Sequence, residues 1–274
     1  MSVAQRFFRS GILVGGANLV ATALLVVRSV ALARLLPVEV FGIYAFAAAL
    51  TTLTAVLARF GMDDALIHRA PPTDNIADAA AIHGGLAIAF AGVWAVLLLA
   101  GSVAFFDGQM LAALIVLTAT QVALLVVATP EALLRRRVQH RLLATIRVVA
   151  MVLSTAVGLV LAVLGQGLWA LLVIDALTAL VGLVALGIWG PAWRPRLSMD
   201  RERIGYFLHF GSRNVTGRLL EEARHKLDKL WTGWALGSQS LGLYSRASAY
   251  GAAPADLINR PINSVVTGVY AELA

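Results

Sequence analysis

The sequence predicts an all-α protein whose helices cross a membrane, and three observations lead to that fold class. The apolar and aromatic residues make up 59% of the 274 residues, the charged residues only 14%, and the mean hydropathy is +0.82. Apolar runs recur along the whole chain at the length of about 20 residues that a spanning helix needs. The arginines lie mostly in the connections between these runs. We therefore expect a polytopic transmembrane helical bundle of about eight spans.

Residues that favour turns separate the apolar runs, so each run is expected to form one helix. Pro37 follows the first run, Asp107 the third and Gly165 the fifth. The seventh and eighth runs carry more polar residues than the first six. The expected spans are residues 11–36, 40–60, 79–105, 110–129, 142–164, 167–188, 204–236 and 241–269.

The arginines in the connections predict how these spans are oriented. If the N-terminus is cytoplasmic, the segment with Arg6 and Arg9 and the even-numbered connections lie inside, whereas Arg34 falls outside. Positive residues gather on the cytoplasmic side of membrane proteins. The arginine pattern therefore predicts a multi-pass membrane protein with a cytoplasmic N-terminus.

The connection at residues 191–203 is the clearest boundary in the chain. It contains Pro191, Pro195 and four arginines. We expect it to be a basic cytoplasmic linker between two units. Residues 1–190 would then form an N-terminal lobe of six helices, and residues 204–274 the first two helices of an incomplete second lobe.

Arg28, Asn18 and Asp175 are polar residues inside expected spans. Inserting a charge there costs roughly 2.5 to 3.5 kcal/mol, so such residues usually face the bundle interior or a water-filled cavity. Arg28 has an alternative, because its long side chain can reach toward the membrane surface. For Asp175, pairing with a neighbouring helix and a role in ion coupling agree equally well with the position.

Residues 213–229 contain the strongest polar face in the sequence. At about 100° per residue, the charged side chains fall within an arc of about 120°, opposite a leucine-rich side. Charges of opposite sign stand three or four residues apart and can neutralise each other. We expect a spanning helix whose polar face lines an aqueous cavity; the alternative is an amphipathic helix on the cytoplasmic surface. The face consists of Arg218, Glu221, Glu222, His225, Asp228 and Lys229.

Signatures of catalysis are weak. Cysteine is absent, the histidines show no metal-ligand spacing, and no phosphate-binding loop of the Walker type occurs. The acidic pair Asp63 and Asp64 is more typical of a solvated helix cap than of a metal-nucleotide site. The basic residues do not form an arm with interleaved aromatics, so nucleic acid is not an expected partner. We expect a protein that is not an enzyme and that uses no cofactor or metal.

Two blocks of sequence carry a resemblance to a known family. The first contains Asn18, Arg28, ARLLPVEVFGIYA at 33–45 and RFGMDDALIHR at 59–69. The second contains FGSRN at 210–214, HKLDKLWTGWALGSQSLGLYSRASAY at 225–250 and INRPI at 258–262. In order, spacing and number of spans, the chain resembles the polysaccharide biosynthesis (oligosaccharide, O-antigen type) flippases of the multidrug/oligosaccharidyl-lipid/polysaccharide exporter superfamily.

The resemblance implies two six-helix lobes around a central cavity that opens alternately to the two sides of the bacterial cytoplasmic (inner) membrane. The implied cargo is polyprenyl-diphosphate-linked oligosaccharide, turned from the cytoplasmic to the periplasmic leaflet for assembly of O-antigen, capsule or exopolysaccharide. The implied partners are this lipid-linked oligosaccharide, membrane lipid, and a polysaccharide polymerase with other assembly proteins.

The resemblance implies that Arg28 and the face from Arg218 to Lys229 line the cavity, and we expect further polar residues to act with them. Cavity-lining residues that contact the lipid diphosphate would be Arg28, Asn18, Arg59, Arg213, Arg218 and Lys229. Coupling or charge balance would fall to Asp175, Glu221, Glu222, His225 and Asp228. Arginine suits phosphate oxygens because its charge is fixed and its planar N–H groups can bind two of them at once.

Two other functions stay open at this stage. A drug or small-cation exporter of the same superfamily would favour an acidic, aromatic-lined cavity. A membrane glycosyltransferase or polymerase acting on polyprenyl-linked sugars would need an acidic cluster on a large outer loop. Since members of the resembled family continue past the eighth helix, we expect this sequence to be a member truncated at its C-terminus.

Overall fold

The computed structural model of the chain is helical throughout the residues that it describes, apart from short turns. These residues are 24–59, 73–104, 106–136, 140–189 and 201–273. Residues 24–35 are helical and precede the first helix with complete bounds. The helices that follow are α2 (Val38–Arg59), α4 (Thr73–Ala104), α5 (Gly108–Arg136), α6 (His140–Val163), α7 (Gly167–Trp189) and α8 (Arg201–Leu273).

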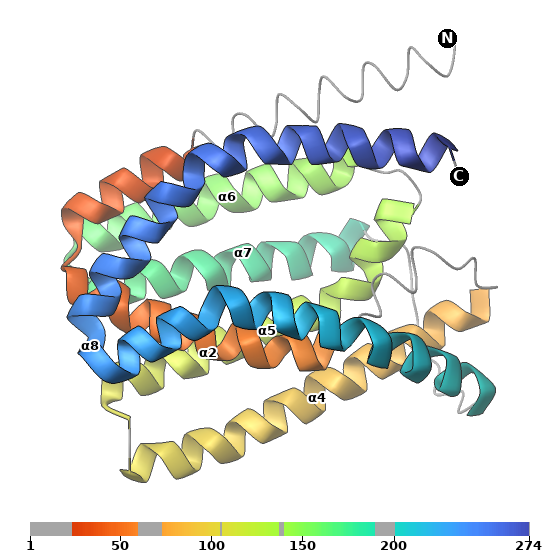
Figure 1. Cartoon of the computed structure of the whole chain (residues 1–274), viewed down its shortest axis with the longest axis horizontal. Helices are drawn as coiled ribbons and strands as arrows, with labels where there is room; N and C mark the ends of the chain where they lie inside the picture. The colour runs from red at the N-terminus through yellow and green to blue at the C-terminus, as the bar shows by residue number, and fades with distance from the viewer. Residues whose placement is uncertain (1–23, 60–72, 105, 137–139, 190–200, 274) are drawn as a thin grey trace.

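Successive helices run in opposite directions along the long axis of the molecule (Figure 1). The α4–α5 connection, the α6–α7 connection and the bend of α8 lie at the same end of the bundle, on the left of the figure. Such alternation is the arrangement that a chain adopts when it crosses a membrane repeatedly with short connections.

Local sequence explains where two of these helices begin and end. Asp107 caps α5, because its carboxylate oxygen Oδ1 accepts a hydrogen bond of 2.7 Å from the Met110 backbone N–H. Gly165 ends α6 with a φ of +76°, a backbone conformation that favours glycine. The Gly165 and Gln166 N–H groups then donate to the carbonyl oxygens of Ala162 and Leu161. Both turns lie where the sequence predicts breaks.

Helix α5 corrects one expected boundary. The sequence predicts that this span ends at residue 129, but α5 continues through Pro130 to Arg136. A proline inside a helix removes one backbone hydrogen bond. In this protein, Leu133 and Leu134 beyond the proline are both buried, and their packing holds the last turns in helical form.

The core lies where α2, α4, α5 and α7 meet. Its side chains interleave aromatic rings from α4 with alanines and leucines from the other three helices. Phe90 and Trp94 are 7% and 3% exposed and pack edge to face, with ring centroids 6.4 Å apart. Small residues such as Ala47 and Ala113 let the helix backbones approach closely, as is usual in membrane bundles.

Five helical stretches are long and apolar enough to cross a membrane, within the residues that the structure describes. They agree with the second to sixth expected spans. Their outward faces carry large exposed apolar side chains, among them Ile88, Leu99 and Val163. The stretches are Val38–Arg59, Ala81–Ser102, Gly108–Leu134, Leu142–Val163 and Gly167–Ile188. The chain is a polytopic helical membrane protein.

The other three expected spans stand differently. Half of the first one, residues 11–23, lies outside the described residues. The seventh and eighth fall within α8, which is helical except at Gly237 and is too polar to be recognised as a span from hydropathy. The count of eight spans, and the division into two lobes, therefore stay predictions.

Helix α8 consists of two arms joined at Gly237, which has a φ of +81°. The first arm precedes Gly237 and runs back along the bundle; the second arm follows it and runs toward the C-terminus (Figure 1). The bend packs tightly against the start of α2. A Cβ atom on Gly42 would overlap the carbonyl oxygen of Ser238, and one on Gly242 would overlap that of Val38. Glycine is required at both positions because a side chain would separate the helices.

Candidate functional site

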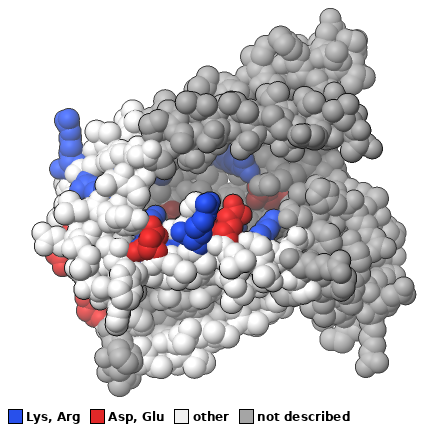
Figure 2. All heavy atoms as spheres, viewed as in Figure 1, with Lys and Arg blue, Asp and Glu red and all other residues white. Residues whose placement is uncertain are grey.

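A pocket of about 290 Å³ opens between α2 and the two arms of α8. The α2 wall presents Phe41 and Tyr44 beside small alanines, and Ser29 of the preceding helix closes another side. The rest of the lining comes from both arms of α8. On the face of the molecule shown in Figure 2, Lys and Arg side chains gather with Asp and Glu side chains in a hollow.

The first arm of α8 contributes two lysines to the pocket, Lys226 and Lys229. The ammonium nitrogen of Lys226 lies 3.4 Å from a carboxylate oxygen of Glu222, one turn earlier on the same face. Lys229 is partly buried and forms no ion pair within the described part of the chain. One of the two positive charges is thus left without a carboxylate at contact distance.

The second arm of α8 contributes a third positive charge. The guanidinium carbon of Arg246 lies 4.1 Å from the centroid of the Phe41 ring. A guanidinium over an aromatic ring is attracted to it without using a hydrogen bond, so its N–H groups stay available to oxygen acceptors. Arg246 is therefore held in place by a contact that does not consume its hydrogen-bond donors.

Behind the α2 wall, Tyr44 connects the pocket to a carboxylate. Its hydroxyl donates a hydrogen bond of 2.5 Å to Asp175 Oδ2 on α7. The charge of Asp175 also interacts with the charge of Arg28, which lies on the helix that precedes α2. The structure thus places two of the predicted site residues, Arg28 and Asp175, within electrostatic range of each other and of Tyr44.

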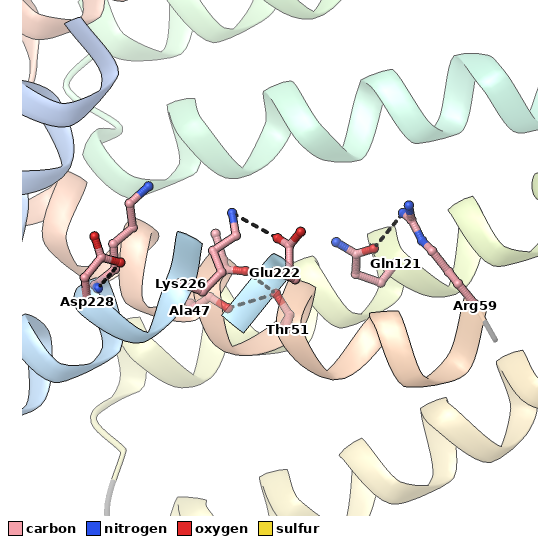
Figure 3. Close-up of polar contacts among 9 residues, drawn as sticks. Ala47, Thr51, Arg59, Gln121, Glu222, Lys226 and Asp228 are labelled. Carbon is pink, nitrogen blue, oxygen red and sulfur yellow. Dashed lines mark hydrogen bonds and ion pairs between the residues drawn. The ribbon is translucent and has the colours of Figure 1, made fainter. Parts of the chain in front are cut away.

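The acidic residues of α8 lie at the margin of the pocket, and the described lining includes no carboxylate. Asp228 is exposed, and it accepts a hydrogen bond from the Tyr244 hydroxyl on the other arm. Glu222 pairs with Lys226 (Figure 3). In the described residues no group of His, Asp and Glu side chains is arranged to hold a metal ion.

Arg59 lies away from the pocket. It is the last residue of α2, and its Nη2 atom is 3.4 Å from the side-chain oxygen of Gln121 on α5. Fifteen residues of helix separate it from Tyr44, which corresponds to about 22 Å. Figure 3 shows Arg59 and Gln121 farther along α2 than Glu222 and Lys226. Arg59 is thus not part of the lining of this pocket.

The remaining predicted residues stand as follows. Arg218 is partly buried one turn before Glu222, whereas Glu221 and His225 are exposed. His225 contacts Arg224, with 3.3 Å between Nε2 and Nη2. Asn18 lies outside the described residues, and so does the side chain of Arg213.

Sequence reasoning missed several lining residues. Tyr44 and Tyr250 look like ordinary aromatic residues of apolar spans, and only the folded chain places them beside the cations. Lys226 lies at the edge of the predicted polar arc. Arg246 stands in the segment YSRASAY, inside the second block that carries the family resemblance. Its position within that block was the one available signal.

A comparison with protein-family models identifies the family of the chain. Searches of curated proteins and of solved structures gave no significant match. A family model described as polysaccharide biosynthesis protein matches residues 31–274. The match spans both walls of the pocket, from the start of α2 to the end of α8. The chain therefore belongs to the polysaccharide biosynthesis protein family.

Proposed function

We propose that the chain is a flippase for polyprenyl-diphosphate-linked oligosaccharide, used in the assembly of a cell-surface polysaccharide such as O-antigen, capsule or exopolysaccharide. The observation that carries the proposal is the charge of the pocket. Lys226, Lys229 and Arg246 line it from both arms of α8, and its described lining contains no carboxylate. In a membrane protein of this family, such a pocket suits the anionic diphosphate of a lipid-linked glycan.

The pocket also combines charge with surfaces that suit a sugar-bearing lipid. Phe41, Tyr44 and Tyr250 give it aromatic walls, and Ser29 and Ser245 add hydroxyl groups. Tyr250 is 42% exposed, so the pocket is open on that side. A headgroup can therefore bind while the rest of the ligand extends outward.

The proposed orientation of the chain rests on the arginine distribution, and the proposed direction of transport rests on the family resemblance. The N-terminus is cytoplasmic in this proposal, and the bend of α8 faces the periplasm together with the α4–α5 and α6–α7 connections. These three features lie at one end of the bundle (Figure 1). The cargo would pass from the cytoplasmic to the periplasmic leaflet of the inner membrane, where a polymerase and other assembly proteins receive it.

A binding experiment with the purified chain tests the proposal. The probe is a polyprenyl diphosphate that bears a short glycan, with a lipophilic drug cation as the competing class. Arg246→Gln removes one charge-assisted contact, worth about 1.5 to 3 kcal/mol, and should weaken binding of the probe roughly 10- to 150-fold. Arg147→Gln is the matched control, because Arg147 is an exposed arginine paired with Glu131 outside the pocket.

The result expected is saturable binding of the glycolipid, weakened by Arg246→Gln and unchanged by Arg147→Gln. Preferential binding of the drug cation would replace the proposal with the exporter alternative. Chemical change of the bound glycolipid would favour the enzyme alternative.

A further inference from the structure

Most hydroxyl groups in the lining of the pocket already donate their protons to the protein itself. The Tyr44 hydroxyl donates to Asp175 Oδ2 at 2.5 Å, and the Tyr250 hydroxyl donates to the Ser29 carbonyl oxygen at 3.3 Å. The Ser245 hydroxyl donates to a backbone carbonyl oxygen of its own helix at 3.1 Å. Each hydroxyl has one proton to donate. The donors that the described lining leaves for a ligand are therefore chiefly the charged groups of the lysines and the arginine.

The α2 wall of the pocket is apolar. Its members stand at the spacing i, i+3, i+4, i+7 and i+8, which places them along one stripe of the helix. Because the Tyr44 hydroxyl is bound to Asp175, this stripe presents mainly carbon to the pocket. The charged guanidinium of Arg246 lies over the Phe41 ring at one end of the stripe, and three alanines continue it along α2. The members of the wall are Phe41, Tyr44, Ala45, Ala48 and Ala49.

A sugar and an isoprenoid chain would interact differently with this lining. A sugar hydroxyl that leaves water needs both a donor and an acceptor in the site, and an unmade hydrogen bond is costly. The described lining includes no carboxylate, carboxamide or imidazole side chain that could accept from sugar hydroxyls. An isoprene unit has no polar atoms and gains free energy when it leaves water. The α2 wall therefore favours an isoprenoid over a sugar.

We propose that the pocket binds the diphosphate together with the first isoprene unit of the lipid, and that the sugars lie outside it. The cations of α8 contact the phosphate oxygens, and the α2 wall packs against the isoprenoid carbons. The pocket is open beside the exposed Tyr250, which leaves room for the rest of the ligand. This inference rests on the proposed function and adds that the pocket recognises the lipid diphosphate and does not discriminate between glycans.

The test compares three diphosphate diesters of equal charge: dimethyl diphosphate, farnesyl methyl diphosphate and farnesyl glucosyl diphosphate. Their dissociation constants are measured with the purified chain. The farnesyl group should tighten binding roughly 10- to 100-fold, because its first isoprene unit is buried against the α2 wall. Replacing the methyl cap of the farnesyl probe by glucose should change the affinity by less than about threefold, since the sugar lies outside the pocket.

Substitutions in the α2 wall locate the isoprenoid. Ala48→Leu fills part of the wall, so it should cancel most of the gain from the farnesyl group and leave the affinity for dimethyl diphosphate unchanged. Ala45→Leu makes the same change one turn earlier and serves if Ala48→Leu does not fold. Ala247→Leu is the matched control, because Ala247 is exposed on the second arm of α8 and outside the described lining. Detergent takes up the farnesyl chain equally in all three, so a difference between variants reports on the pocket.

The outcomes separate this inference from the proposed function. If none of the three probes binds, the proposed function fails and the inference fails with it. If the farnesyl probes bind and glucose tightens binding by about tenfold or more, the pocket holds a sugar and the inference alone is wrong. A farnesyl group that brings no gain, or a gain that survives both Ala48→Leu and Ala45→Leu, also overturns the inference.

Discussion

Helices α4 to α7 and helix α8 differ in what they expose. The first group shows apolar side chains outward and buries aromatic and aliphatic ones, so its stability comes from packing. Helix α8 exposes Glu221 and Asp228 as well as Trp231 and Trp234, and its inward face carries lysines. If α8 binds the ligand as proposed, stability and ligand binding should be separable in this chain. Substitutions in the two regions should therefore have effects of different kinds.

The largest expected difference is in the side from which two single-cysteine variants are labelled, which tests whether the first arm of α8 crosses the membrane. The native chain contains no cysteine, so single cysteines report their location cleanly. We expect Arg136→Cys, at the end of α5, to be labelled from the cytoplasm, and Gln239→Cys, an exposed position beside the bend of α8, from the periplasm. The labelling should be all or none, measured with a membrane-impermeant maleimide. Labelling of both positions from the same side would show that the first arm of α8 lies on the surface.

The next effect concerns the contact between α2 and the bend of α8. Gly42→Ala places a methyl group against the Ser238 backbone, which cannot give way, and should destabilise the protein by about 3 kcal/mol. Gly92→Ala is the matched control, because Gly92 on α4 has open space around it. It should be neutral or slightly stabilising, since alanine favours helix. Thermal unfolding in detergent measures both, and equal effects would contradict the tight crossing.

A substitution in the core should lower stability without changing the affinity for the ligand. Leu125 on α5 is fully buried, so Leu125→Ala should lower stability by about 2 kcal/mol through the cavity it leaves. The folded fraction should bind farnesyl diphosphate with unchanged affinity. Lys229→Gln should do the reverse, with weaker binding and an unchanged melting temperature. A large loss of binding in Leu125→Ala would show that the two regions are coupled.

The smallest effect is expected at the exposed ion pair between Arg147 and Glu131. The two side chains lie 2.9 Å apart, but the arginine is 62% exposed. Water and salt screen such pairs, so Arg147→Ala should cost less than about 1 kcal/mol. Thermal unfolding at low and high salt checks this, and a loss as large as that of Leu125→Ala would contradict it.

Local signals in the sequence predicted the parts of the fold that depend on neighbouring residues. Asp107 and Gly165 mark real helix ends, because a cap and a positive φ need only residues nearby. Apolar runs identified the five spans for the same reason. The helix bend is equally local, since Gly237 falls between the seventh and eighth expected spans.

The site depends on contacts between distant segments, and there the sequence was less informative. The predicted polar face of α8 includes Lys229, which lines the pocket, but it omits Lys226, which also lines it. Glu221 and His225, which belong to the predicted face, are exposed. The rotation of the helix is set partly by Gly233, which packs against Phe46 of α2. Likewise, the bond between Tyr44 and Asp175 joins residues 131 positions apart. No periodicity within one segment reports such a pairing.

The crossing of α2 with the bend of α8 has a consequence for how the chain responds to its surroundings. Where a side chain would stand, Gly42 and Gly242 each direct a Cα hydrogen at a carbonyl oxygen of the other helix. Such Cα–H···O contacts carry no net charge and do not titrate. Salt should therefore leave this contact unchanged, while it weakens the proposed attraction of the pocket for anions. A change in salt concentration should thus alter how much of the pocket is occupied by ligand, without weakening the contact between α2 and the bend of α8 that positions both walls of the pocket.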